Sequence, residues 1–208
     1  MRLQVAIDRV SVKRADEIID LTSGYADIIE IGTSLIKDFG LDKSVKTLKE
    51  KYPKQCILAD IKTCDEGEYE FRKTYENGGD IPTVMGFSSI DTLRACQKVA
   101  REFQKEYMID LLEISNDKLE ILKKEFSEAI FCIHLPSDAQ GVGLEELVIK
   151  MCDQLKGIKK IAVAGGVKLD NIHVMKKAGV DIVIVGSAIS KAENIPEISR
   201  KFKEAIRR

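Results

Sequence analysis

An acid, a base and a second acid lie within six positions of one another in the third apolar segment of the chain. Asp60, Lys62 and Asp65 follow the apolar run that begins at Cys56. Side chains alternate between the two faces of a strand, so Asp60 and Lys62 are expected on one face and Asp65 beyond the strand end. Because buried charges cost free energy unless they pair or bind a ligand, this pattern predicts either an inward salt bridge that plugs a barrel end or a ligand site.

Further titratable side chains recur where other apolar segments end. They are Asp8, Glu30, Asp110 and His134. Imidazole titrates near neutral pH, which makes His134 the best candidate for a general acid or base. Glu30 and Asp60 belong to adjacent segments, and carboxylates so placed suit a hard divalent cation such as Mg²⁺. Titratable groups at equivalent points of consecutive units indicate one catalytic cleft.

Glycine-rich turns follow the last two apolar segments. The seventh segment ends in Gly165 and Gly166, and the eighth is followed by Gly186 and Ser187. Backbone N–H groups at such turns, together with the start of a following helix, favour an anion. An alternative is that these glycines only make tight turns. Their place after the seventh and eighth segments, the usual phosphate site of a (β/α)8 barrel, favours a phosphorylated substrate.

The elements that must position these groups alternate along the chain. Strand-length apolar runs are expected at residues 3–7, 26–31, 56–61, 83–85, 107–112, 129–133, 161–164 and 182–185. Helical patterns, with apolar residues three and four apart, are expected at residues 12–21, 35–49, 68–75, 92–103, 119–126, 144–155, 171–178 and 195–206. Eight such units without a linker predict a single (β/α)8 domain, a TIM barrel, over residues 1–208. A doubly wound open sheet is the alternative, although no GxGxxG motif follows the first segment.

The composition disfavours two classes of partner. The formal net charge is −1 and the basic residues are spread along the chain, so neither nucleic acid nor an anionic membrane surface is indicated. The five cysteines, at positions 56, 64, 96, 132 and 152, form no CxxC pair, which favours reduced thiols over a disulfide framework or a zinc site. Without a signal-peptide core or a stretch of transmembrane length, a cytoplasmic protein is expected.

These motifs resemble those of a known family. The run Asp60-Ile61-Lys62-Thr63-Cys64-Asp65 is similar to the Asp-x-Lys-x-x-Asp signature of the orotidine 5′-monophosphate decarboxylase suprafamily. The resemblance extends over essentially the whole chain. Its other matching runs are residues 3–8, 29–33, 83–86, 133–134 with Asp138 and Gln140, 162–166 and 185–189.

Two branches of the suprafamily carry the Glu-x-Gly-Thr element seen at Glu30 and the histidine after the sixth strand. They are the 3-hexulose-6-phosphate synthases and the 3-keto-L-gulonate-6-phosphate decarboxylases, which use Mg²⁺ and a 1,2-enediolate of a phosphorylated ketopentose. Asp110 stands where the decarboxylases usually have Glu, and Ser137 where they typically have Arg, so the synthase branch is favoured. The resemblance implies aldol addition of D-ribulose 5-phosphate to formaldehyde, giving D-arabino-hex-3-ulose 6-phosphate. A decarboxylase, or an enzyme doing both, is the alternative.

Carried over by position, the resemblance implies a role for each candidate residue. Glu30 and Asp60 would bind Mg²⁺, Lys62 would stabilise the enediolate oxygens, and His134 would move a proton on or off the enediolate carbon. Asp8 would hold a substrate hydroxyl, Asp110 would contact substrate, and Gly165, Gly166, Gly186 and Ser187 would hold the phosphate. The family is dimeric, which implies a homodimer in which Asp65 enters the partner's active site.

The sequence departs from the family at two places, and two further hypotheses stay open. Leu135-Pro136 replaces a smaller pair, and Ser187 stands where many members have an Arg on the phosphate. A Schiff-base aldolase using Lys62 is disfavoured, because the neighbouring acids would raise the pKa of Lys62 rather than lower it. A non-catalytic sugar-phosphate-binding barrel is disfavoured by the complete set of acids with Lys62 and His134.

Overall fold

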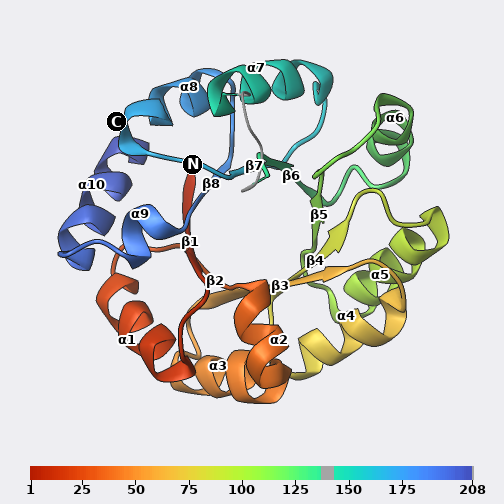
Figure 1. Ribbon diagram of the computed structural model, residues 1–208. Helices are drawn as coiled ribbons and strands as arrows, with labels where there is room; N and C mark the ends of the chain where they lie inside the picture. Colours follow the sequence, from red (N-terminus) through yellow and green to blue (C-terminus); the bar gives the residue numbers. More distant parts are fainter. Residues whose placement is uncertain (137–142, 208) are drawn as a thin grey trace.

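The strands of the protein close into a barrel. The computed structural model describes residues 1–136 and 143–207, so Ser137, Asp138 and Gln140 lie outside the described residues. Strands β1 to β8 are parallel, pair in chain order and close between β8 and β1, with the helices around them (Figure 1). The expected (β/α)8 barrel is therefore confirmed, and the open doubly wound sheet is excluded.

The elements run as follows. The strands are β1 (Arg2–Ile7), β2 (Ile28–Ile31), β3 (Cys56–Thr63), β4 (Ile81–Met85), β5 (Met108–Asp110), β6 (Ile130–His134), β7 (Ile161–Ala164) and β8 (Ile182–Val185). The helices are α1 (Val12–Thr22), α2 (Thr33–Leu41), the π-helix η1 (Asp42–Lys46), α3 (Thr47–Lys51), α4 (Gly67–Glu76), α5 (Ile90–Phe103), α6 (Asn116–Glu125), α7 (Leu144–Gln154), the 3₁₀-helix η2 (Leu169–Asn171), α8 (Ile172–Lys177), α9 (Ser187–Ser190) and α10 (Ile195–Arg207).

The second helical region differs most from the sequence expectation. One helix was expected over residues 35–49, but α2, η1 and α3 occupy this region with a kink at Gly40. Gly40 has a φ of 74°, a left-handed conformation that glycine adopts without steric cost and that interrupts a right-handed helix. A periodic apolar pattern does not show such a break, because the residues on both sides of it still face the barrel.

The strand β5 is shorter than expected. It ends at Asp110 rather than at residue 112. The Asp110 carboxylate turns back and its Oδ1 accepts a hydrogen bond from the backbone N–H of Leu112 at 2.9 Å. This local bond gives the backbone an alternative to the strand ladder, so the strand stops where its functional side chain begins.

Two layers of apolar side chains fill the fold. One lies between the strands and the surrounding helices, and the other fills the barrel. Ile28, Ile81, Ile130 and Ile182, one from each even-numbered strand, belong to the inner cluster. Branched side chains contributed by alternate strands are the usual filling of such barrels. Within the described residues, no helix is long and apolar enough to cross a membrane.

Three aspartates connect neighbouring strands by hydrogen bonds at the amino-terminal end of the barrel. Asp27, Asp80 and Asp181 each precede a strand and accept the backbone N–H at or near the start of a neighbouring strand. Asp80 also accepts Lys49 Nζ at 2.8 Å and Lys105 Nζ at 3.0 Å. Burial raises the pKa of Asp80, but these three donors outweigh it and hold that pKa below its usual value.

We expect Asp80→Asn to lower the free energy of unfolding by about 2 kcal/mol at pH 7, because two ammonium groups lose their shared anion. A carboxyl with a depressed pKa stabilises the fold above its unfolded-state pKa of about 4 and loses that contribution as pH falls further. The difference between variant and wild type should therefore shrink in acid. Urea unfolding of the variant and the wild type, at pH 7 and at a pH below about 4, measures this difference. Asp42→Asn, at an exposed ion pair with Lys46, serves as the control, and an equal loss in both variants would contradict the prediction.

Candidate active site

The predicted site residues gather at the carboxyl ends of the strands. A cleft of about 740 Å³ lies there, lined by residues that follow or end β1, β2, β3, β6, β7 and β8. The predicted residues that line it are Asp8, Glu30, Asp60, Lys62, His134, Gly165, Gly166, Gly186 and Ser187. Two other predicted residues, Asp65 and Asp110, are not among its lining residues.

A bulge in β3 aims Lys62 into the cleft. The pairing of β3 with β4 shifts register between Ala59 and Thr63, and Lys62 has a φ of 51°. A left-handed conformation is uncommon for residues other than glycine and marks strain of the kind found at functional sites. The backbone N–H of Lys62 is tied to Thr83 Oγ1 at 2.9 Å, which fixes this conformation. Simple strand alternation is thus not what places Lys62 beside Asp60.

The Lys62 ammonium lies between two carboxylates. Its Nζ is 2.9 Å from Asp110 Oδ2 and 3.3 Å from Asp60 Oδ2. Burial disfavours the charged form, but the two acids outweigh it and raise the pKa of Lys62 above its ordinary value. The expected inward salt bridge with Asp60 is therefore present, as part of a larger network. A permanently charged lysine suits oxyanion stabilisation and not Schiff-base formation.

Asp110 joins Lys62 to His134. Its Oδ2 also lies 2.8 Å from His134 Nδ1. Burial raises the pKa of Asp110, but the bonds from His134 and Lys62 outweigh it and lower that pKa, so the group is a carboxylate that can only accept hydrogen bonds. His134 Nδ1 therefore carries the proton, and the neutral ring has Nε2 as its basic nitrogen. Because its oxygens are engaged by three protein donors, Asp110 is suited to positioning these two side chains rather than to contacting substrate.

Glu30 and Asp60 form a buried acidic pair. Each is 8% exposed. Asp60 accepts hydrogen bonds from Thr83 Oγ1 at 2.9 Å and Thr33 Oγ1 at 2.8 Å, which hold both of its oxygens. Burial, reinforced by the charge of Asp60, raises the pKa of Glu30 to about 8. Two carboxylates forced together in this way favour a cation between or beside them.

Glu30 and Asp60 are not joined by a third side chain of a metal-binding type among the described residues. Within the part of the chain that the structure describes, no three His, Cys, Asp or Glu side chains come together as a metal-binding group. Mg²⁺ is typically held by one or two carboxylates, with waters and substrate oxygens completing its octahedral shell. The oxygen-only pair of Glu30 and Asp60 fits that chemistry and does not fit a structural zinc site.

Asp8 is held at the rim by the segment that opens α2. Its Oδ1 accepts hydrogen bonds from the backbone N–H of Ser34, at 3.1 Å, and from the Ser34 hydroxyl. A Cβ atom at Gly32 would lie 2.2 Å from the Asp8 carboxyl group, so only glycine leaves room for this acid. Asp8 is exposed and lines the cleft, where it can accept a hydrogen bond from a ligand hydroxyl.

The two glycines that follow β7 are required for different structural reasons. A Cβ atom at Gly165 would meet the Leu135 carbonyl oxygen at 2.1 Å, so this residue lets the chain after β6 pass close by. Gly166 has a φ of 78° and nothing within 4 Å of a Cβ atom, which leaves its backbone open. Leu135 donates its N–H to Ala164 at 3.0 Å. The Leu135-Pro136 departure therefore begins with a regular contact to β7.

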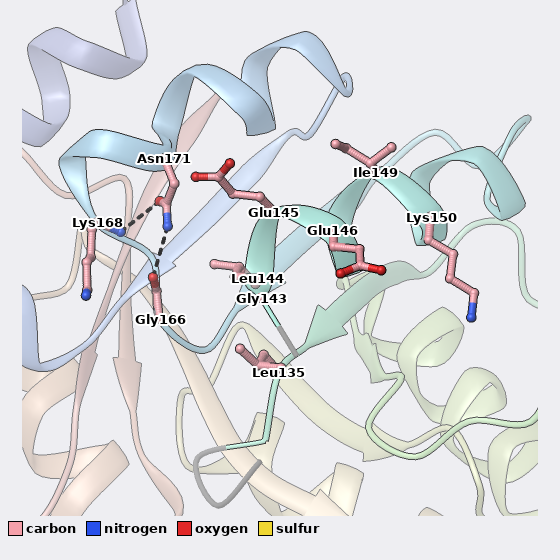
Figure 2. A pocket seen from close by; sticks show the side chains of 10 residues that line it. All are labelled: Leu135, Gly143, Leu144, Glu145, Glu146, Ile149, Lys150, Gly166, Lys168 and Asn171. Atoms are coloured by element: carbon pink, nitrogen blue, oxygen red, sulfur yellow. Dashed lines mark hydrogen bonds between the residues drawn. The ribbon is translucent and has the colours of Figure 1, made fainter. Parts of the chain in front are cut away.

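An asparagine holds the turn after β7. Asn171 accepts the backbone N–H of Lys168 at 2.9 Å and donates to the Gly166 carbonyl at 3.1 Å (Figure 2). Figure 2 also shows the Lys168 side chain extending away from this bridge. Lys168 lines both the cleft and a neighbouring hollow of about 820 Å³ beside the start of α7. This cation therefore lies at the end of the cleft that Gly165 and Gly166 line.

Several residues of the site carry no signal that sequence reasoning detected. They are Gln4, Ser34, Thr83, Lys168 and Asn171, which hold or flank the charged groups, whereas Thr33, which bonds to Asp60, belongs to the Glu-x-Gly-Thr element of the sequence. A lone threonine or glutamine inside an apolar strand looks like ordinary strand composition. Its partner is known only once the fold shows which residues of the neighbouring strand lie beside it. Asp65 is exposed, and within the chain its Oδ1 accepts the N–H of Glu66 at 2.8 Å.

Comparison with known proteins agrees with this geometry. The model of the orotidine 5′-phosphate decarboxylase / HUMPS family matches residues 1–202. The 3-hexulose-6-phosphate synthase of Bacillus subtilis (strain 168) is 33% identical over 215 aligned positions, covering 99% of each chain. That of Mycobacterium gastri is 32% identical, covering 99% of this chain and 100% of the relative.

Solved structures show the same similarity. The 3-hexulose-6-phosphate synthase of Salmonella typhimurium is 30% identical with a TM-score of 0.92, over 99% of this chain and 98% of that one. The 3-keto-L-gulonate-6-phosphate decarboxylase of Vibrio cholerae is 25% identical with a TM-score of 0.87, over 99% and 97% of the two chains. The chain belongs to the orotidine 5′-phosphate decarboxylase / HUMPS family.

Proposed function

We propose that this protein catalyses the Mg²⁺-dependent aldol addition of D-ribulose 5-phosphate to formaldehyde, giving D-arabino-hex-3-ulose 6-phosphate. The protein is an enzyme of the aldehyde-lyase class, like its full-length relatives named 3-hexulose-6-phosphate synthase. The observation that carries the proposal is the Lys62–Asp110–His134 network, which lies beside the Glu30–Asp60 pair at the end of the barrel. It provides a fixed cation and a basic nitrogen at one cleft.

The cleft has residues suited to bind the phosphate, a hydroxyl and the carbonyl of the substrate. The phosphate is bound at the glycine-lined end by Gly165, Gly166, Gly186 and Ser187, where Lys168 supplies positive charge. Asp8, at the rim of the cleft after β1, accepts a hydrogen bond from a sugar hydroxyl. Glu30 and Asp60 hold Mg²⁺, which supplies Lewis-acid polarisation of the substrate carbonyl. The cleft volume of about 740 Å³ is within the range of small-molecule sites.

The chain's own residues then carry the proton and the charge. His134 Nε2 removes a proton from C1 of ribulose 5-phosphate, and the electron pair moves into the C1–C2 bond to form the 1,2-enediolate. The Lys62 ammonium stabilises the negative oxygen that develops. The C1 carbon of the enediolate then forms a bond to the formaldehyde carbon as the C2 carbonyl is restored, and the formaldehyde oxygen takes the proton that His134 Nε2 removed. Asp110 stabilises the charged imidazole during this exchange.

Decarboxylation of 3-keto-L-gulonate 6-phosphate is the second candidate function. It is favoured by the structural match to the Vibrio cholerae decarboxylase, and it would use the same Lys62 and carboxylates to form its enediolate. The synthase is preferred because the curated relatives at 31–33% identity carry that name. Asp110, where the decarboxylases usually have Glu, supports the same choice.

The direct experiment assays the purified protein with Mg²⁺ against both substrates. Consumption of formaldehyde with formation of a hexulose phosphate is expected with ribulose 5-phosphate. Release of CO₂ from 3-keto-L-gulonate 6-phosphate without any aldol activity would replace the proposal by its alternative. Aldol activity that survives EDTA would contradict the role of the cation.

Replacement of Lys62 tests the oxyanion role. We expect Lys62→Gln, which retains a hydrogen-bond donor near Asp110 but no charge, to lower kcat by about 10²–10³-fold. Steady-state kinetics measure the loss, and thermal unfolding shows that the variant is folded. Lys124→Gln, on the exposed side of α6, is the matched control. A near wild-type rate in Lys62→Gln would contradict the oxyanion role of Lys62.

The raised pKa of Glu30 gives Mg²⁺ binding a defined pH dependence. Below about pH 8 the Glu30 carboxyl holds a proton without the cation, and binding must displace it. We expect Mg²⁺ affinity to rise about tenfold per pH unit up to that pH, with about one proton released per ion at pH 7. Calorimetric titrations in two buffers of different ionisation enthalpy count the protons. A pH-independent affinity with no proton release would contradict this assignment.

The position of Asp65 supports a homodimer in which its carboxylate serves the partner's site. Asp65 is exposed and forms no ion pair among the described residues, and Tyr69 on α4 and Phe87 after β4 are more than half exposed. In that arrangement each active site combines Lys62 of one chain with Asp65 of the other. Equal mixing of inactive Lys62→Gln and Asp65→Asn chains should restore about a quarter of wild-type activity, since half the dimers would hold one intact site. Failure of a properly exchanged mixture to regain activity would contradict the shared site.

A further inference from the structure

A glutamine lies buried in the barrel beneath the acidic pair. Gln4 is on β1, 0% exposed, and is not among the residues that line the cleft. Its register partners are Ile28 on β2 and Ile184 on β8, the strands on either side of β1 (Figure 1). Both isoleucines belong to the apolar cluster inside the barrel. A polar side chain in such surroundings costs free energy unless its hydrogen bonds are satisfied.

Only half of the Gln4 amide is satisfied. Its Nε2 donates a hydrogen bond of 2.6 Å to Glu30 Oε2. Its Oε1 is buried and has no hydrogen-bond partner among the described residues. To bind a cation Glu30 must be a carboxylate, which can only accept hydrogen bonds, so in that state the amide presents its N–H group to Glu30 and leaves its oxygen against the apolar interior. An apolar side chain of the same size would avoid this cost, so the amide has to be explained by what it does for Glu30.

The hydrogen bond from Gln4 fixes the Glu30 carboxyl group from the barrel interior. It occupies Oε2, while Oε1 of Glu30 accepts no bond from the side chains of the described residues. Glu30 also lines the cleft, so this one side chain connects the buried amide to the ligand-binding space. The neighbouring ligand candidate, Asp60, has its own supports in Thr33 and Thr83. Each acid of the pair thus has a neutral hydrogen-bond donor that fixes it.

We propose that Gln4 is a positioning residue for the cation site: its amide holds Glu30 in one orientation with one oxygen free for Mg²⁺. The inference rests on the proposed function, because it takes Glu30 and Asp60 as the ligands. A neutral donor suits this task better than a charged one. A lysine at this position would neutralise Glu30 and compete with the cation, and an acid would add a further negative charge beneath it. Outer partners of metal ligands commonly change metal affinity by about 10–100-fold.

The test measures cation binding apart from turnover. Mn²⁺, which takes the same oxygen ligands as Mg²⁺, reports occupancy by electron paramagnetic resonance, and calorimetry gives the affinity for Mg²⁺ itself. In Gln4→Met, which keeps the volume but removes the amide, we expect the Kd for either ion to rise about 10–100-fold. The metal-free protein should unfold at the same temperature as wild type or higher, because the unpaired Oε1 is gone. At saturating Mg²⁺ kcat should largely recover.

Two further variants keep the test decisive. Leu58→Met alters packing in the same inner cluster, at the residue paired with Glu30 on β3, and should bind the ions like wild type. Gln4→Leu replaces Gln4→Met if the latter does not fold. Wild-type affinity in the folded Gln4 variants, or an equal loss in Leu58→Met, would overturn the positioning role while leaving the proposed function intact. Absence of ion binding by the wild-type protein would instead overturn the metal site of the proposed function.

Discussion

The buried carboxylate of Asp110 is the contact on which the catalytic end of this barrel depends. One oxygen, Oδ2, is shared by the Lys62 ammonium and the His134 imidazole. An ammonium inside a protein is tolerated only when its charge is compensated, and Lys62 has Asp110 on one side and Asp60 on the other. The same carboxylate determines which nitrogen of His134 carries the proton. A single acid therefore fixes both the charge and the base of the site.

The barrel explains why these groups meet. Parallel strands bring their carboxyl ends to one face, and inward side chains from neighbouring strands then surround one space. Below that level the interior is filled by branched apolar residues such as Ile28 and Ile130. Polar residues begin with Gln4, and the acidic residues Glu30 and Asp60 follow above it. The interior therefore changes from apolar filling to acidic side chains that line the cleft.

Much of this could be predicted from the sequence, because the relevant signals are local. The alternation of apolar runs and helical patterns predicted all eight strands, and acids at strand ends predicted which side chains would meet. The kink at Gly40 could not be predicted, since the apolar periodicity continues through it. The bulge that turns Lys62 was also missed, because the run 56–63 has the composition of a regular strand.

The supporting residues of the site were beyond sequence reasoning for a different reason. Thr83 and Gln4 have meaning only through contacts made across strands, with Asp60 and with Glu30. Asp110 was identified as a site residue, but its shared bonds to Lys62 and His134 depend on distances that spacing along the chain does not contain. Charged residues at strand ends indicate a site from the sequence alone. The neutral residues that position them can be identified only once the fold is known.

The proposed function depends on removal of a proton from C1 of ribulose 5-phosphate before any aldehyde reacts. Incubation in D₂O with Mg²⁺ and without formaldehyde tests it, followed by nuclear magnetic resonance of the C1 protons. Exchange of one C1 proton for deuterium is expected in the wild-type enzyme and should be lost in His134→Ala. Formation of the hexulose phosphate by an enzyme that never exchanges this proton, or undiminished exchange in His134→Ala, would contradict the account.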